Sequence, residues 1–265
     1  MIHIATSHWK MSTWIDIQLG YIKEFLPGCK TYLSATQNVI DKHGSKFTFA
    51  ADINRRESFV YDSVAGLRGS IDHCERLNGL FDVIELSSNS DDIVLFLDVD
   101  AFPIAPCTDK LHELLDSFEF VSICGCRESR LNPAFCACRV GSFKQIGASW
   151  RIGNYYYRLN DFGANRRVRL CDTGGGTAIE IRRLRKRWLQ LHRCNRRNLH
   201  PVLFGIYGGL AYHNGMGLRS TKRLIPTTWI PRRNRYLLKR KRNGHLIFKV
   251  FNWIRQNRRF YRSLR

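Results

Sequence analysis

Two aspartates separated by one residue follow a strongly apolar segment. Residues 94–104 read VLFLDVDAFPI, so Asp98 and Asp100 directly follow a run of large apolar side chains. In an extended chain, residues i and i+2 project to the same side, and open α/β sheets bind ligands at the carboxyl ends of their strands. Two adjacent carboxylates repel each other unless a cation lies between them, and oxygen ligands suit Mg²⁺ or Mn²⁺. The pattern therefore favours a divalent-metal site over a solvated pair of turn aspartates before Pro103.

The elements expected around this motif alternate between strand and helix. The apolar run at 92–97 is typical of a central strand that is buried on both faces. Apolar spacing and β-prone composition predict strands at 2–6, 30–33 and 46–50, and helices at 12–25 and 70–81. Pro27-Gly28 would end the first helix, and Ser70 would cap the second. This alternation predicts an α/β fold.

The second half of the chain continues the pattern with more basic residues. We expect strands at 119–124 and 134–140, a short helix at 142–150, a basic helix at 182–191 and a glycine-punctuated apolar stretch at 200–213. The sequence contains no internal repeat.

Several segments, taken in chain order, resemble the GT-A glycosyltransferases. They are IHIAT at 2–6, GSIDHCERLNGLF at 69–81, the DVD tripeptide, the segment 134–147, CDTGGGTA at 171–178 and GGLAYHNGMGLR at 208–219. The resemblance implies a Rossmann-like mixed sheet flanked by helices in a catalytic domain at 1–225, followed by a basic amphipathic extension at 226–265. Haloacid-dehalogenase phosphatases and Y-family polymerases also carry D-x-D, but near their N-termini.

The resemblance implies an activity and a ligand set. Such an enzyme, of hexosyltransferase type, transfers a sugar from a nucleoside diphosphate sugar to a glycan or lipid-linked acceptor with the help of Mn²⁺ or Mg²⁺. Asp100 would bind the metal directly, and His213 would be a third ligand. Asp98 would contact the sugar or ribose, or bind the metal through water. Asp172 would be the catalytic base of an inverting enzyme, or would orient the acceptor in a retaining one.

The resemblance also implies a nucleotide site. Its candidate residues are Thr6, Ser7, Arg68, Ser70 and His73, with Arg219 and Lys222 placed to neutralise the diphosphate. Each has a simpler interpretation as a cap or surface charge, just as His213 and Asp172 could be ordinary loop residues. The rival functions are a Mg²⁺-dependent phosphatase or nucleotidyl enzyme that uses the same DVD, and a basic nucleic-acid-binding protein.

Charge is distributed unevenly along the chain. The 265 residues include 43 Lys and Arg against 22 Asp and Glu, a net charge of +21, yet residues 1–120 are net acidic. Residues 231–265 hold 13 Lys and Arg and no acid, with apolar residues near one helical face. Such a helix favours an anionic membrane surface, ahead of nucleic acid or a merely solvated tail.

Cysteine usage bears on location and on a second metal. Nine cysteines without a signal-peptide pattern or a long apolar run predict reduced thiols and a cytoplasmic protein, with contact at the inner face of a membrane through 231–265. Cys124-x-Cys126 and Cys136-x-Cys138 could bind zinc, although structural zinc sites usually have longer spacing. Because i and i+2 thiols share one face of a strand, core packing is the favoured interpretation.

Overall fold

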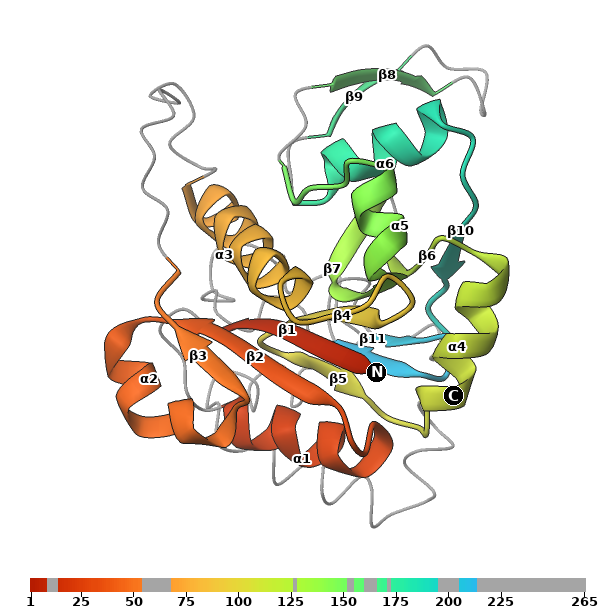
Figure 1. Ribbon diagram of the computed structural model, residues 1–265. Helices are drawn as coiled ribbons and strands as arrows, with labels where there is room; N and C mark the ends of the chain where they lie inside the picture. Colours follow the sequence, from red (N-terminus) through yellow and green to blue (C-terminus); the bar gives the residue numbers. More distant parts are fainter. Residues whose placement is uncertain are drawn as a thin grey trace, which may run out of the picture.

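A computed structural model of the chain describes residues 1–8, 14–53, 68–125, 128–151, 155–159, 166–170, 173–194 and 205–213. At 68–70, 124–125, 128–129, 155–159 and 166–170 the description covers the backbone alone. The centre of the fold is a seven-stranded sheet in the order β10-β6-β7-β4-β1-β2-β3, with helices on both faces (Figure 1).

The sheet is mixed, with its apolar central strand β4 between β1 and β7. The strands are β1 Ile2–His8, β2 Lys30–Ala35, β3 Phe49–Ala51, β4 Ile93–Asp98, β6 Phe120–Gly125, β7 Glu128–Arg139 and β10 Trp188–Leu191. The first four are parallel to one another, β10 is parallel to β6, and β7 runs antiparallel to β4 and β6. Parallel strands end at one edge of a sheet, so the end of β4 lies beside the end of β1.

Helices cover the two faces of the sheet and build two hydrophobic clusters. The helices are α1 Ile15–Phe25, α2 Gln37–His43, the 3₁₀ turn η1 Gly44–Lys46, α3 Arg68–Glu85, α4 Thr108–Ser117, α5 Val140–Gln145 and α6 Gly175–Arg183. Alternate residues of β4 enter the two clusters: Leu95 packs with α1 and α4, whereas Phe96 packs with α3 and α5. This burial on both faces explains why β4 reads as a continuous apolar run.

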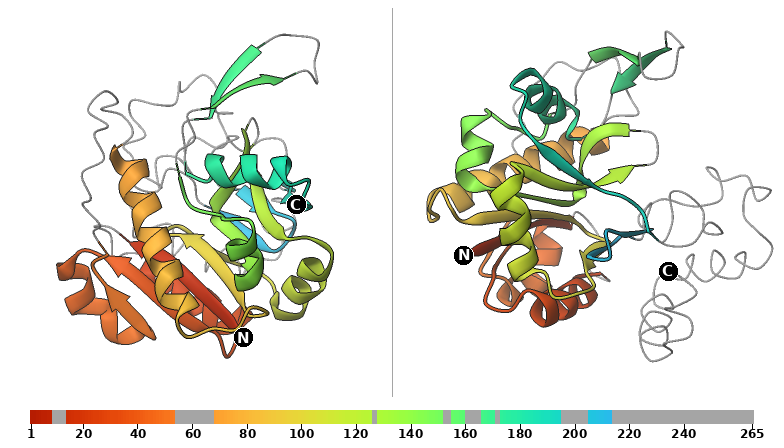
Figure 2. Two further views of the ribbon diagram at one scale, coloured as in Figure 1. Left: turned by 45° about the horizontal axis from the view of Figure 1, so that its top comes forward. Right: turned by 90° about the vertical axis from the view of Figure 1, so that its right-hand side faces the viewer.

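Two smaller sheets complete the described fold. β5 Ala101–Pro103 leaves the turn after β4 and pairs antiparallel with β12 Ala211–His213, which in turn pairs with β11 Gly205–Tyr207. The hairpin of β8 Tyr155–Leu159 and β9 Arg166–Leu170 projects from the body of the molecule beyond α6 (Figure 2). The β5–β12 pair is the more important for the site, because it brings the late histidine next to the DVD turn.

The predicted α/β class, the mixed sheet and the flanking helices are confirmed. The strand at 92–97 and the helix at 70–81 correspond to β4 and α3. Of the predicted domain division at residue 225, the described residues reach only 213, so the extension at 226–265 lies outside them.

The basic helix predicted at 182–191 is wrong. α6 ends at Arg183, Arg185 has a left-handed φ of 52°, and residues 188–191 form β10 against β6. Five of the six residues at 182–187 are Lys or Arg, and like charges close together on a helix repel one another. The backbone of residues 188–191 forms its hydrogen bonds with β6 instead of within a helix.

Other boundaries also differ from the prediction: α3 begins at Arg68, so Ser70 lies inside the helix rather than at its cap, and β7 begins at Glu128 rather than 134. The strand expected at 46–50 begins only at Phe49, because 44–46 form η1. The helix expected at 142–150 spans only 140–145, and Gly147 follows it with a left-handed φ of 64°, a usual way to end a helix. The first helix begins at Ile15 rather than 12, and residues 9–13 lie outside the description.

Candidate metal centre

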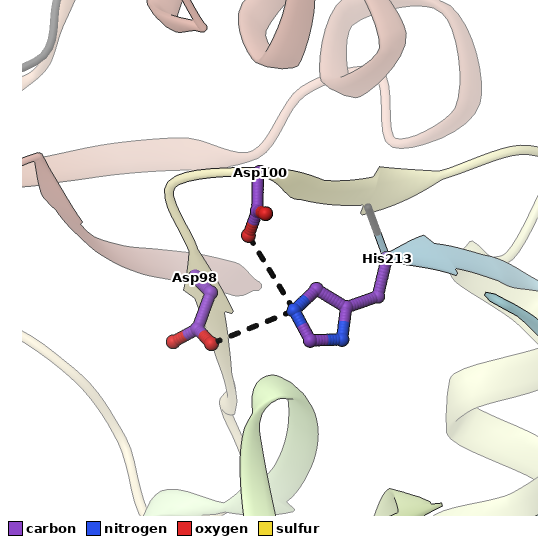
Figure 3. Close-up of side chains that lie close together, drawn as sticks. All are labelled: Asp98, Asp100 and His213. Atoms are coloured by element: carbon purple, nitrogen blue, oxygen red, sulfur yellow. Dashed lines mark ion pairs between the residues drawn. The ribbon is translucent and has the colours of Figure 1, made fainter. Parts of the chain in front are cut away.

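Three side chains from separate segments converge at the end of β4. Asp98 is the last residue of β4, Asp100 lies in the turn to β5, and His213 ends β12 (Figure 3). His213 Nε2 lies 3.4 Å from Asp100 Oδ1 and 3.9 Å from Asp98 Oδ2. One ligand atom of each side chain lies within 4.8 Å of the others. The arrangement offers two carboxylate oxygens and one imidazole nitrogen to a single cation.

Strand pairing, not sequence proximity, places the histidine. Ala101 is the register partner of His213, and Phe102 is the partner of Tyr212. The rings of Phe102 and Tyr212 lie 5.1 Å apart between centroids, within a buried cluster that fixes the β5–β12 pair. Because β4 ends at Asp98, the alternation of a strand does not determine the direction of the Asp100 side chain. The conformation of the turn at residues 99–100 determines it.

The electrostatics of the three side chains fit a bound cation. The side chains of Asp98, Asp100 and His213 are 23%, 5% and 16% exposed. Burial raises the pKa of Asp98 and the charge of Asp100 adds to the effect, while His73 and His213 oppose it. Two carboxylates with so little water gain most from a divalent cation. Carboxylate ligands suit Mg²⁺ and Mn²⁺, and the imidazole makes Mn²⁺ the better match.

One of the predicted nucleotide residues, His73, contacts this centre. His73 comes from α3, and its Nε2 lies 3.3 Å from Asp98 Oδ1, whereas His213 faces the other oxygen of this carboxylate, Oδ2. Arg68 and Ser70 lie in the first turn of the same helix, with only their backbone described. Because His73 contacts Asp98, the amino-terminal part of α3 lies beside the carboxylates.

The two predicted residues of β1 are buried rather than exposed. Ser7 is 7% exposed, and Thr6 is fully buried with its hydroxyl donating a hydrogen bond to Gln18 Oε1 at 3.0 Å. The direct nucleotide contact predicted for the Thr6 side chain is not supported by this geometry, because its hydroxyl faces the interior. Thr6 instead contacts Gln18, whose amide donates a hydrogen bond to the carbonyl of Asp98.

The predicted base, Asp172, lies outside the described residues, as do Arg219 and Lys222. Its neighbour Thr173 is described: the Thr173 carbonyl accepts a hydrogen bond from Arg130 Nη1 at 3.0 Å. The charge of Arg130 also acts on Asp98, where it lowers the pKa against the effect of burial. The segment that follows Asp172 is thus tied to the side of the fold that holds the metal centre.

Sequence reasoning missed Gln18. Its side chain is fully buried and donates hydrogen bonds to the carbonyls of Asp98 and Ala101, on either side of the DVD turn. The signal was present, because Gln18 occupies the apolar face of α1 between Trp14 and Ile22 at helical spacing. A polar residue at such a position needs internal partners.

The cysteines at 136 and 138 pack in the core. Both are fully buried in the cluster that includes α3 and α5, and burial raises the pKa of both thiols well above the usual range. This environment keeps them protonated, which fits the packing interpretation for this pair. Cys126 lies outside the description and Cys124 is described only in its backbone.

Within the described ranges, no helix combines the length and apolar character needed to span a bilayer. The predicted membrane contact through 231–265 falls outside those ranges.

Comparisons with known proteins give only remote likenesses. No protein-family model and no curated protein matches the sequence. Among solved structures, similar chains include the galactosyltransferase LgtC in complex with donor and acceptor sugar analogues (11% identity, TM-score 0.36) and an active-site mutant of LgtC (10% identity, TM-score 0.37). Each likeness covers 55% of this chain, and 60% and 59% of the respective LgtC chains. The chain thus spans less than two thirds of either structure, and values this low leave the function to be argued from the site.

Proposed function

We propose that this protein is a metal-dependent glycosyltransferase that moves a sugar from a nucleoside diphosphate sugar to a glycan or lipid-linked acceptor. The observation that carries the proposal is the convergence of Asp98, Asp100 and His213 at the carboxyl end of the central strand. The ordered segments that resemble GT-A enzymes supply the reaction class. The topology is consistent, because the carboxylates follow a strand between two others at the ligand-binding edge of the sheet.

The three side chains would have different roles in binding the donor and its metal. Asp100 and His213 would hold the cation, preferably Mn²⁺ and otherwise Mg²⁺, with Asp98 completing the site directly, through water or through the sugar. A bound divalent cation would supply Lewis-acid stabilisation for the negative charge that develops on the departing diphosphate. His73, 3.3 Å from Asp98, would keep that carboxylate oriented.

The donor and acceptor sides extend from this centre. Arg68, Ser70 and Ser7 would approach the nucleotide, and Arg219 and Lys222 would neutralise its diphosphate. Asp172 would take the proton of the acceptor hydroxyl, a role that needs a carboxylate within hydrogen-bond reach of that proton. The hydrogen bond from Arg130 to the carbonyl of Thr173, the residue after Asp172, is in keeping with this role because the charge of Arg130 also acts on Asp98.

The phosphatase alternative finds less support in the chain order. In haloacid-dehalogenase enzymes D-x-D follows the first strand, whereas here it follows β4. The two activities also release different products, since a glycosyltransferase liberates a nucleoside diphosphate and a phosphatase liberates inorganic phosphate.

The decisive experiment uses the full chain with a panel of nucleotide sugars and Mn²⁺. Thermal shift would detect binding, and a coupled assay would detect release of nucleoside diphosphate. The matched pair of variants is Asp100→Asn at the site and Asp92→Asn at the opposite edge of the sheet. Metal-dependent release that Asp100→Asn abolishes and Asp92→Asn preserves would support the proposal. Binding indifferent to metal and to Asp100→Asn would contradict it.

We also propose that the basic extension at 226–265 brings the enzyme to an anionic membrane, where a lipid-linked acceptor would lie. The full chain should then co-sediment with phosphatidylserine vesicles and not with phosphatidylcholine vesicles, and high salt should release it. Equal recovery with both lipids would remove this part, and tight salt-sensitive binding to duplex DNA instead would favour the nucleic-acid alternative.

A further inference from the structure

The amide of Gln18 is buried in the middle of an apolar helix face. Trp14, Ile15, Tyr21 and Ile22 surround it along α1 and are themselves buried. Burying an amide without partners costs free energy, so each of its donor and acceptor positions must be used. Gln18 meets this condition with four hydrogen bonds, and they lead to the metal centre.

The four contacts fix the orientation of the amide. Gln18 Nε2 donates to the carbonyl oxygens of Asp98 at 2.8 Å and Ala101 at 2.7 Å. Gln18 Oε1 accepts from Thr6 Oγ1 at 3.0 Å and from His8 Nε2 at 2.8 Å. Because carbonyl oxygens only accept, the nitrogen must face the turn and the oxygen must face β1. Consequently His8 carries a proton on Nε2.

The amide therefore joins two elements at the ligand-binding edge of the sheet. On one side it holds the end of β1, and on the other it holds both carbonyls that bracket residues 99–100. Asp98 is one candidate ligand, and Asp100 lies inside the bracketed turn. Ala101 is the register partner of His213, the third candidate. The hydrogen bonds of Gln18 therefore reach the backbone of one candidate ligand, Asp98, and of Ala101, which follows Asp100 and pairs with His213.

We propose that Gln18 is a positioning residue of the metal centre: its amide fixes the DVD turn and so sets the affinity for the divalent cation. The proposal rests on the proposed function for the identity of the bound group, but not for the geometry of the turn. Without the hydrogen bonds from Gln18 (here called the clamp), the DVD turn would have to become ordered when the metal binds. The free energy needed for this ordering would lower the affinity for the metal. Residues that orient metal ligands typically contribute 10- to 100-fold in affinity.

The first test is a Mn²⁺ titration of the full chain, read from the EPR signal of free Mn²⁺. Gln18→Met keeps the length of the side chain but removes both donors to the turn. Gln18→Glu also keeps the length and places an oxygen where the donors stood. We expect each to weaken Mn²⁺ binding by about 10-fold or more. The matched control is Val39→Ala, which removes buried volume in α2, away from the turn, and should leave Mn²⁺ affinity within twofold of the wild type.

The second test does not involve metal. Amide hydrogen exchange of the metal-free proteins, followed in a peptide that covers the turn, should accelerate in Gln18→Met relative to the rest of the sheet. In Val39→Ala the turn should exchange as in the wild type. This local change separates positioning from a general loss of stability, which would accelerate exchange throughout the fold.

The outcomes separate the two proposals. Local loosening together with weakened Mn²⁺ binding supports the clamp. Turn exchange that is unchanged in both Gln18 variants overturns it, as does Mn²⁺ affinity that falls no further than in Val39→Ala. If the wild type binds no Mn²⁺ while the turn still loosens in Gln18→Met, the metal function fails and the effect of Gln18 on affinity fails with it. Its structural hold on the turn would then remain.

Discussion

The two edges of the central sheet each hold a cluster of aspartate and histidine. The clusters differ in how far hydrogen-bond donors and positive charges offset the burial of their strand aspartates, Asp92 and Asp98. At the amino edge, His3 Nε2 lies 3.3 Å from Asp92 Oδ2 and His3 Nδ1 lies 3.0 Å from the Tyr32 hydroxyl. At the carboxyl edge, Asp98 and Asp100 face His213 at 3.9 and 3.4 Å. β4 and the residues next to its ends supply the aspartates of both clusters, whereas His3 comes from β1 and His213 from β12.

The pKa values of the two strand aspartates move in opposite directions. Burial would raise the pKa of Asp92, but hydrogen bonds from the Met1 amino group, the Asn89 N–H and His3 outweigh it and lower the pKa to about 2. Burial raises the pKa of Asp98, whose histidine contacts do not compensate fully. The donors around Asp92 stabilise its ionised form, as expected of a structural group. Asp98 lies beside a second carboxylate, Asp100, so a bound cation would stabilise its ionised form. Residue type alone does not separate the two cases.

The comparison is tested most strongly by removing one carboxylate at each edge. We expect Asp100→Asn to lower kcat/KM for sugar transfer about 1000-fold, because it removes the metal's charge stabilisation of the diphosphate. Asp92→Asn should retain activity within about twofold at pH 7. Coupled measurement of nucleoside diphosphate release checks both, and equal losses in the two variants would show that the edges do not differ in function.

The histidines provide the second test. His213→Gln should weaken Mn²⁺ binding about 100-fold, because the neutral amide is a poor replacement for an imidazole ligand. His3→Gln should leave the affinity unchanged. Titration followed by EPR measures both, and a His213→Gln variant with wild-type affinity would remove this residue from the metal site.

At the amino edge the expected effect is on stability. Because the pKa of Asp92 is lowered from 3.8 to about 2 on folding, its ionised form stabilises the protein above pH 4 and this contribution is lost as the pH falls toward 2. Asp92→Asn should therefore lower the free energy of unfolding at pH 7 by about 2 kcal/mol and reduce the loss of stability between pH 4 and 2. Urea denaturation over this pH range gives the comparison with the wild type, and parallel curves for the two proteins would contradict it.

The smallest effect is expected from His3 itself. Burial lowers its pKa below the usual 6.5, against the opposing contacts with Asp92. The unfolded chain therefore takes up this proton first, and stability contributed by the neutral ring falls as the pH drops below 6.5. His3→Gln should reduce the loss of thermal stability between pH 7 and 5. An unchanged pH dependence in differential scanning calorimetry would assign that loss to other groups.

The sequence predicted those elements whose pattern is local. The run at 92–97 identified β4 because burial on both faces leaves a continuous apolar signature, and α3 followed from its apolar spacing. The basic segment at 182–191 misled the helix prediction, because pairing of 188–191 with β6 depends on a strand distant in sequence. Local propensity carries no information about such a partner.

The candidate site shows the same division. Asp98 and Asp100 were evident from the sequence, since two carboxylates after a buried strand have few structural uses. Their histidine was suggested only by resemblance, because nine histidines are available and His213 is distant in the chain. Thr6 was predicted to face a nucleotide, and the structure turns it inward toward Gln18.

The sequence by itself determined the α/β class, the central strand and the pair of carboxylates at its end, because alternation and apolar runs are properties of neighbouring residues. The resemblance suggested His213, but only the tertiary structure brings it to those carboxylates. The tertiary structure alone also decided that hydrogen-bond donors lower the pKa of Asp92 while burial raises that of Asp98, and which groups the buried amide of Gln18 contacts. Each of these depends on the register between strands and on contacts between segments far apart in the chain, and these are fixed only when the whole sheet packs.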